Sequence, residues 1–211
     1  MNRKIKSYDW SLPIAWLLLC TASMYTAGYL NFYMSQFINW SLAICFLGAA
    51  QSILLIHMLD RPWRWLVLSY AGWLIAYILQ SGLYYLDLPS EIYTLSIGLS
   101  IGLFVGILQS LVISSRLVNR IIWTLASVIG WSLPFIYLAA AESGLLGPGT
   151  REWLYMGLYD TPLASVIINF VVGLSLGLTT GIVLAYLLYQ NWKKQKPIKP
   201  MPEPETSAEN V

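Results

Sequence analysis

Residues 92–114 read IYTLSIGLSIGLFVGILQSLVIS and contain no charged side chain. A helix of about 20 apolar residues crosses the hydrocarbon core of a bilayer, and this stretch is long enough. Its glycines, Gly98, Gly102 and Gly106, recur every fourth residue. That spacing places them on one face of a helix. The stretch therefore predicts a membrane-spanning helix with one face of small residues.

The rest of the chain has the same character. Of its 211 residues, 57% are hydrophobic and 10% are charged, whereas about 25% are charged in a typical soluble domain. A soluble fold must cover its surface with polar groups, so this composition favours a protein in lipid. Prolines, glycines and charged residues separate the apolar runs. The predicted spans are 12–32, 38–58, 63–84, 92–114, 121–141 and 163–189.

The basic residues give the orientation. With the N-terminus inside, eleven of the 12 Lys and Arg residues lie in inner segments, and only Arg151 lies outside. Such an excess marks cytoplasmic loops. The predicted fold is therefore all-α: a polytopic membrane protein with six transmembrane helices and both termini inside. Residues 1–189 form the membrane domain, residues 151–159 are expected as a short surface helix, and residues 190–211 form a disordered cytoplasmic tail.

An internal repeat is visible in the middle of the chain. Residues 48–73 align without a gap on residues 106–131, and eight positions are identical, including Gly48/Gly106 and Gln51/Gln109. Helices 2–3 and 4–5 are thus predicted to be parallel copies of one hairpin. Gly173, Gly177 and Gly181 of helix 6 echo Gly98, Gly102 and Gly106 of helix 4. Helix 1 carries Ala27-Gly28-Tyr29, which weakly resembles Ala71-Gly72-Trp73, so a third hairpin made of helices 6 and 1 is a hypothesis.

The glycine faces are predicted to pack helices closely, since small residues let two backbones approach in a membrane. The same residues form two Gly-x-Ser-x-Gly patterns around Ser100 and Ser175. A hydrolase with that pattern needs a strand–turn–helix and a nearby His and acid. Here the pattern lies within an apolar helix and the only histidine is His57. We expect both serines to be dispensable.

Gln51 and Gln109 are the polar residues that most need an explanation. A buried amide in lipid needs a partner, so each either makes an interhelical hydrogen bond or contacts a ligand. Their common depth suggests a shared polar contact between the two. Trp73 and Trp131 lie deep in their helices and either pack the core or line a cavity for a lipid, an isoprenoid or an aromatic solute. Trp16, Trp63, Trp65 and Trp123 are instead predicted to belong to the aromatic belt at the inner interface.

Several chemistries find no support. We predict no catalytic residue, metal site or cofactor, because His57 has no neighbouring ligands and Cys20 and Cys45 lie within apolar runs. No Asp, Glu, Lys or Arg lies in the middle of a predicted span, which argues against proton- or ion-coupled transport. The net charge of +2 gives no indication of nucleic acid binding.

The repeated pattern is Gly-x-x-Gln-Ser, a basic loop, and then Trp-x-x-x-Ser-x-x-Gly-Trp. Over residues 48–133 it resembles a family of uncharacterised six-helix bacterial membrane proteins common in cyanobacteria. In that family a Trp usually follows the Gln, whereas Ser52 and Ser110 stand there in this chain. The resemblance implies a bacterial inner membrane, or a thylakoid membrane if the source is a cyanobacterium. It implies no activity.

Two functional hypotheses follow. The first is a non-enzymatic structural or assembly partner in a membrane complex, with the lipid bilayer and other membrane protein subunits as partners. The second is a binder or carrier of a small apolar or aromatic solute, which would use Trp73, Trp131 and an acidic outer rim. An intramembrane enzyme ranks third.

Overall fold

The computed structural model describes residues 11–30, 35–113, 116–147 and 162–195. These residues form six long helices and no strand, and each helix is long and apolar enough to cross a membrane. The helices are α1 (Ser11–Leu30), α2 (Gln36–Leu54), α3 (Trp63–Tyr84), α4 (Ser90–Ile113), α5 (Leu117–Glu142) and α7 (Pro162–Gln195), and a 3-10 turn, η1 (Leu55–His57), follows α2.

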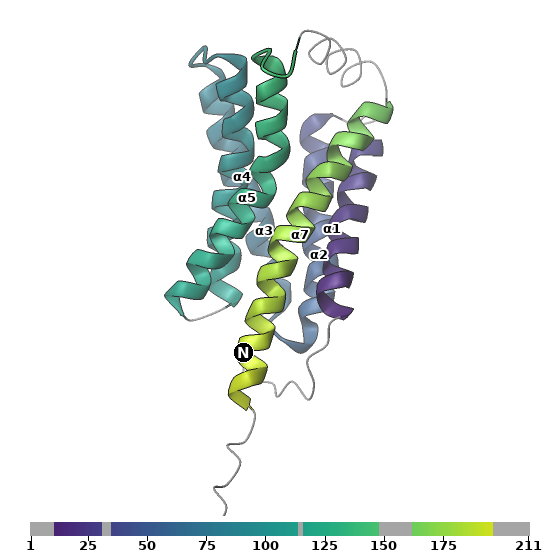
Figure 1. Ribbon diagram of the computed structural model, residues 1–211, viewed down its shortest axis with the longest axis vertical. Helices are drawn as coiled ribbons and strands as arrows, with labels where there is room; N and C mark the ends of the chain where they lie inside the picture. The colour runs from purple at the N-terminus through teal and green to yellow at the C-terminus, as the bar shows by residue number, and fades with distance from the viewer. Residues whose placement is uncertain (1–10, 31–34, 114–115, 148–161, 196–211) are drawn as a thin grey trace, which may run out of the picture.

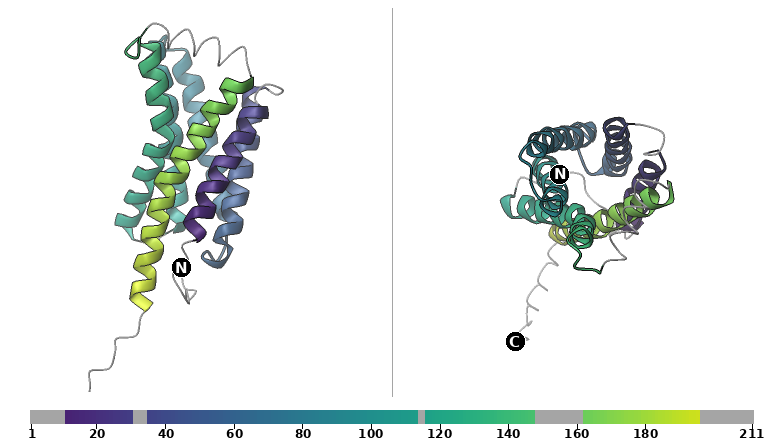
Figure 2. Two further views of the ribbon diagram at one scale, coloured as in Figure 1. Left: turned by 45° about the vertical axis from the view of Figure 1, so that its right-hand side comes forward. Right: turned by 90° about the horizontal axis from the view of Figure 1, so that it is seen from above.

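The six helices form a closed ring. Each packs against the two helices that precede and follow it in the chain, and α7 packs against α1 to close the circle. Figure 1 shows α3, α4 and α5 on one side of the bundle and α1, α2 and α7 on the other. Seen from above, the helices surround a common centre (Figure 2). Side chains from all six helices therefore have access to one core.

The helix bounds differ from the predicted spans mainly at the end of the bundle that the sequence predicts to be cytoplasmic. α3 has the expected bounds, whereas α5 starts at Leu117 and α7 continues to Gln195. Hydropathy reports only the part of a helix that lipid covers, and polar residues can extend the backbone ladder beyond it. The described part of α7 ends at Gln195. The predicted surface helix at 151–159 and residues 196–211 lie outside the described residues.

The outside of the ring is apolar, and its core contains polar side chains as well as apolar ones. Large apolar residues cover the outside of the ring; Leu18, Ile53, Ile78 and Ile182 are each more than half exposed. Amide and hydroxyl side chains are buried inside it, among them Gln51, Gln80, Gln109, Ser69, Ser127 and Thr180. The hydrogen bonds that these polar groups need must therefore come from within the ring.

Candidate functional site

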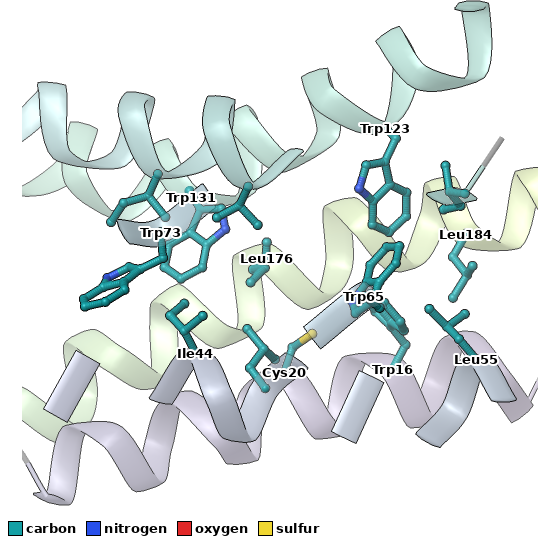
Figure 3. Close-up of a cluster of buried hydrophobic side chains, with 14 of the residues drawn as sticks. Trp16, Cys20, Ile44, Leu55, Trp65, Trp73, Trp123, Trp131, Leu176 and Leu184 are labelled. Atoms are coloured by element: carbon teal, nitrogen blue, oxygen red, sulfur yellow. The ribbon is translucent and has the colours of Figure 1, made fainter. Parts of the chain in front are cut away.

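Three tryptophans meet in the core of the bundle. Trp16 of α1, Trp65 of α3 and Trp123 of α5 are all 0% exposed. Their ring centroids lie 5.8 Å, 5.9 Å and 5.4 Å apart, and each pair is arranged edge to face (Figure 3). Aromatic quadrupoles favour this arrangement. The helices α1, α3 and α5 are thus joined through one aromatic cluster, here called the tryptophan triad.

Each indole of the triad donates a hydrogen bond to the helix that precedes it in the ring. Nε1 of Trp65 donates to Oε1 of Gln51 on α2 at 2.9 Å. Nε1 of Trp123 donates to Oε1 of Gln109 on α4 at 3.2 Å, and Nε1 of Trp16 donates to Oγ1 of Thr180 on α7 at 2.9 Å. An indole can only donate, so each needs such an acceptor when buried. The bonds tie α2 to α3, α4 to α5, and α7 to α1.

The two glutamines also donate through their amide nitrogens. Nε2 of Gln109 donates to Oγ of Ser69 at 2.8 Å, and Nε2 of Gln51 donates to Sγ of Cys20 at 3.3 Å. Ser69 follows Trp65 by four residues, and Cys20 follows Trp16 by four residues. Gln109 therefore links Trp123 on α5 to Ser69 on α3, and Gln51 links Trp65 on α3 to Cys20 on α1. Among the described residues each glutamine bonds directly to these partners, and no direct hydrogen bond joins the two amides. A shared contact through a water molecule stays a prediction.

Thr180, which is bonded to the third tryptophan of the triad, does not link helices in the way that Gln51 and Gln109 do. Thr180 accepts from Trp16, but its hydroxyl donates back to the carbonyl of Leu176 within α7. Ser127 follows Trp123 by four residues and so matches Ser69 and Cys20 in sequence. Its hydroxyl oxygen is buried and has no hydrogen-bond partner within the part of the chain that the structure describes. A threonine is two heavy atoms shorter than a glutamine, and here it makes only one of the two links between helices.

The structure corrects the position of three tryptophans. Trp16, Trp65 and Trp123 were expected in the aromatic belt, yet all three point into the core. Trp63 does lie on the surface, with 59% of its side chain exposed. Residues two positions apart face nearly opposite sides of a helix, so Trp63 and Trp65 cannot both face lipid. Hydropathy indicates the depth of these residues but not the side that they face.

Trp73 and Trp131 are both buried and lie toward the other end of the core from the triad (Figure 3). Trp131 lines a central void of only about 10 Å³, together with Gln51, Gln109 and the triad residues Trp16 and Trp123. Trp73 stacks on Tyr77 with a centroid distance of 5.6 Å. Trp131 thus packs the core, while Trp73 borders a larger space.

That space is an aromatic pocket of about 310 Å³. Its lining residues are Trp40, Trp73, Tyr77, Gln80, Ser81, Tyr84, Tyr85, Tyr93, Ile97, Ile101 and Phe135. The Gln80 amide spans its polar part: Nε2 donates to Ser100 at 2.9 Å, and Oε1 accepts from Ser96 at 3.1 Å. Ligand sites typically start at about 300 Å³ and are mostly apolar with a few fixed polar groups. The pocket has these properties on a small scale.

The predicted glycine faces lie at two helix crossings. A Cβ added at Gly98, Gly102 or Gly106 of α4 would lie 2.7 Å, 2.6 Å or 2.8 Å from the nearest atom of α5. One added at Gly173 or Gly177 of α7 would lie 2.7 Å or 2.8 Å from α1. At Gly181 the nearest atoms would be at 3.6 Å, an ordinary contact. Five of the six glycines therefore permit a close approach of backbones, and Gly181 does not need to be glycine.

Four glycines outside the predicted faces also make close crossings. They are Gly28, Gly48, Gly72 and Gly130, and at each an added Cβ would come within about 3 Å of another helix. Gly72 packs on Val105 of α4, and Gly130 packs on Leu176 of α7. Gly72 thus brings α3 close to α4, and Gly130 brings α5 close to α7. Because all four are isolated in the sequence, no stripe reveals them.

Both serines of the Gly-x-Ser-x-Gly patterns have structural hydrogen bonds. Ser100 accepts from Gln80, as described above. Ser175 of α7 donates to the carbonyl of Gly130 on α5 at 2.7 Å. Gly130 lies four residues before Pro134, which has no N–H to donate to that carbonyl within the helix. Ser175 thus satisfies a carbonyl that a proline leaves free, and the expectation that it is dispensable is revised.

The arrangement provides helix packing around the tryptophan triad and a pocket lined by aromatic side chains. No group of three or more His, Cys, Asp or Glu side chains that could hold a metal ion occurs in the described ranges. Four residues with structural roles were not predicted from the sequence. Trp16, Cys20 and Thr180 belong to the hydrogen-bond network of the core, and Gln80 lines the aromatic pocket. A detectable signal existed for Thr180, because Gly177-x-x-Thr180 has the spacing of Gly48-x-x-Gln51 and Gly106-x-x-Gln109.

Comparison with known proteins found no relative of this chain. No protein-family model, curated protein or solved structure matches this chain.

Proposed function

We propose that this chain is a non-enzymatic integral membrane protein that serves as a structural or assembly partner in a bacterial membrane complex. It crosses the bilayer six times with both termini inside. The apolar exterior of the ring and the hydrogen-bonded polar groups buried inside it support insertion, since lipid leaves buried polar groups to satisfy one another. The uneven distribution of Lys and Arg supports the orientation.

We also propose that the ring consists of three related hairpins: α2–α3, α4–α5 and α7–α1. In support, Gly48, Gly106 and Gly177 have equivalent surroundings. An added Cβ at each would meet the first and fourth residues after a triad tryptophan. This geometry matches Gly177 with Gly106, one helical turn away from the alignment of Gly177 with Gly102 made on sequence alone. On the same proposal Met24, rather than Tyr29, corresponds to Trp73 and Trp131.

One observation carries the proposal of a scaffold. The amides that could have bound a substrate, Gln51 and Gln109, are each bonded to two other helices of the same chain. Their removal would disturb the junction of three helices. A core in which the polar groups hold helices to each other suits a rigid module that presents its outer surface to other subunits.

Native purification tests this proposal. The tagged chain would be extracted from its own membranes in a mild detergent, and co-eluting proteins would be identified by mass spectrometry. We expect a partner protein in a fixed stoichiometric ratio, and a mock purification with an unrelated six-helix protein is the control. Elution of the chain alone, under conditions that preserve other membrane complexes, would contradict the proposal.

The aromatic pocket supports a second candidate function, the binding of a small apolar or aromatic solute. Its aromatic residues can enclose a flat ring or a short chain, and Gln80 can orient one polar group. Organic extraction of the purified protein followed by mass spectrometry would reveal such a solute. It should be retained by a Trp63→Ala variant outside the pocket and lost from a Tyr93→Ala variant. Equal retention by both variants would exclude the pocket.

A further inference from the structure

A second hollow lies at the opposite end of the bundle from the aromatic pocket. It is a groove of about 560 Å³ next to the connection between α2 and α3. Val67 of α3 and Leu111 of α4 form part of its apolar wall, and Asp60, Arg61 and Arg64 line its charged end. The groove thus joins a charged rim to an apolar surface that runs along two helices.

The charges of the rim are available to a ligand. Arg61 and Arg64 are exposed, and neither forms an ion pair with another residue that the structure describes. The Arg64 guanidinium lies 5.8 Å from the ring centroid of Trp63. This cation–π contact holds the guanidinium in position without occupying its N–H donors. Two arginines against the single Asp60 leave the groove with a net charge of +1.

We propose that this groove binds an anionic phospholipid. The phosphate lies against the guanidinium groups of Arg61 and Arg64, since the planar guanidinium matches phosphate oxygens in pairs. Asp60 accepts a hydrogen bond from a head-group hydroxyl. One acyl chain follows Val67 and Leu111 toward the centre of the membrane. The proposal rests on the membrane insertion proposed above, but not on which end of the bundle is cytoplasmic.

The apolar wall distinguishes a lipid from a free phosphate. Val67 and Leu111 are each 51% exposed, and both lie on the outer surface of the ring that lipid would cover. Trp63, also exposed, lies beside the arginines at the level where indole rings prefer the membrane interface. A soluble phosphate would use only the rim, whereas a phospholipid uses the rim and the wall together.

Native mass spectrometry of the full chain in detergent tests the site. The protein would be titrated with phosphatidylglycerol, phosphatidylcholine of the same acyl chains, and glycerol phosphate. We expect phosphatidylglycerol to bind most tightly. The double variant Arg61→Gln/Arg64→Gln should weaken that binding by about thirtyfold, if each interfacial arginine contributes about 1 kcal/mol. A Val67→Trp variant, which fills the wall and keeps both charges, should weaken it as well.

The control is Lys193→Gln/Lys194→Gln at the end of α7, which removes the same charge away from the groove. Equal loss in both double variants would show general charge attraction and overturn the site. Equal affinity for phosphatidylcholine would overturn the selection of an anionic lipid, and equal affinity for glycerol phosphate would overturn the lipid assignment. Release of the chain from membranes by alkaline carbonate would instead contradict the proposed insertion. Failure of the insertion can thus be distinguished from failure of the lipid site.

Discussion

Trp123, Gln109 and Ser69 form a chain of hydrogen bonds that runs from α5 through α4 to α3. Trp65, Gln51 and Cys20 form the corresponding chain from α3 through α2 to α1. In each case a single amide satisfies a buried donor on one side and bonds an acceptor on the other. At the scale of the residue, the fold depends on a few side chains that each join three helices.

The amide of Gln109 should therefore contribute measurably to the free energy of unfolding. Gln109→Leu leaves the indole N–H of Trp123 without an acceptor, and we expect a loss of about 1 kcal/mol, in the range for interhelical bonds in lipid. Unfolding by dodecyl sulfate in detergent micelles measures it. In the Trp123→Phe background the same change should have a smaller effect, because the stranded donor is gone. Strictly additive losses would contradict the hydrogen-bond account.

The incomplete third position gives a prediction of opposite sign. Thr180→Gln would keep an acceptor for Trp16 and supply an amide like those of Gln51 and Gln109, which bond the residues that match Ser127 in sequence. The Ser127 hydroxyl now lacks a partner among the described residues. We expect a gain of about 0.5–1.5 kcal/mol, while Thr180→Leu, which has no acceptor for Trp16, should destabilise. Thermal unfolding in detergent compares the two. If the Gln variant were no more stable than the Leu variant, the three positions would not be equivalent.

At the scale of the element, the spacing of the helices depends on where a backbone can touch a backbone. Glycines bring α4 onto α5 and α7 onto α1, and Pro134 frees a carbonyl that Ser175 then binds from the next helix. A glycine at a tight helix crossing should therefore tolerate substitution less well than a glycine at a looser position on the same helix.

Two glycines of the predicted faces should respond differently to one methyl group. Gly102→Ala would place a Cβ 2.6 Å from Cα of Val128, and a backbone atom cannot move aside cheaply. We expect a loss of about 1–3 kcal/mol. Gly181→Ala meets nothing closer than 3.6 Å, so it should be neutral or gain up to about 1 kcal/mol from helix propensity. Equal effects of the two substitutions in unfolding assays would be incompatible with these crossings.

The bond between Ser175 and Gly130 should depend on Pro134. Ser175→Ala leaves the Gly130 carbonyl buried without a donor, and we expect a loss of about 1 kcal/mol. In a Pro134→Ala background the N–H of residue 134 can bond that carbonyl, so the serine change should have little effect. Ser81→Ala, an exposed serine that bonds within its own helix, is the control. An unchanged loss in the alanine background would show that the serine acts in another way.

At the scale of the whole molecule, the sequence predicted the positions of the helices better than it predicted which side of each helix faces the core. Runs of apolar residues indicate six helices because lipid sets a minimum length for a span, and α3 has the predicted bounds. The burial of Trp16, Trp65 and Trp123 was missed, since a helix that is apolar on all sides has no separate polar face to show which side points inward. Gln51 and Gln109 were recognised because amides are conspicuous in apolar runs, but their tryptophan partners lie on other helices, whose rotation the sequence does not specify.

The ring is proposed to span a membrane, with the tryptophan triad inside it and the ends of the chain in the cytoplasm. Labelling of single cysteines in intact cells tests this proposal most directly. The background carries Cys20→Ser, which keeps an acceptor for Gln51, and Cys45→Ala. Cysteines at Ser90 and Ser143 should react with a membrane-impermeant thiol reagent. Cysteines at Arg61 and Lys194 should react only after the cells are opened. Reaction at Arg61 or Lys194 in intact cells would contradict the account.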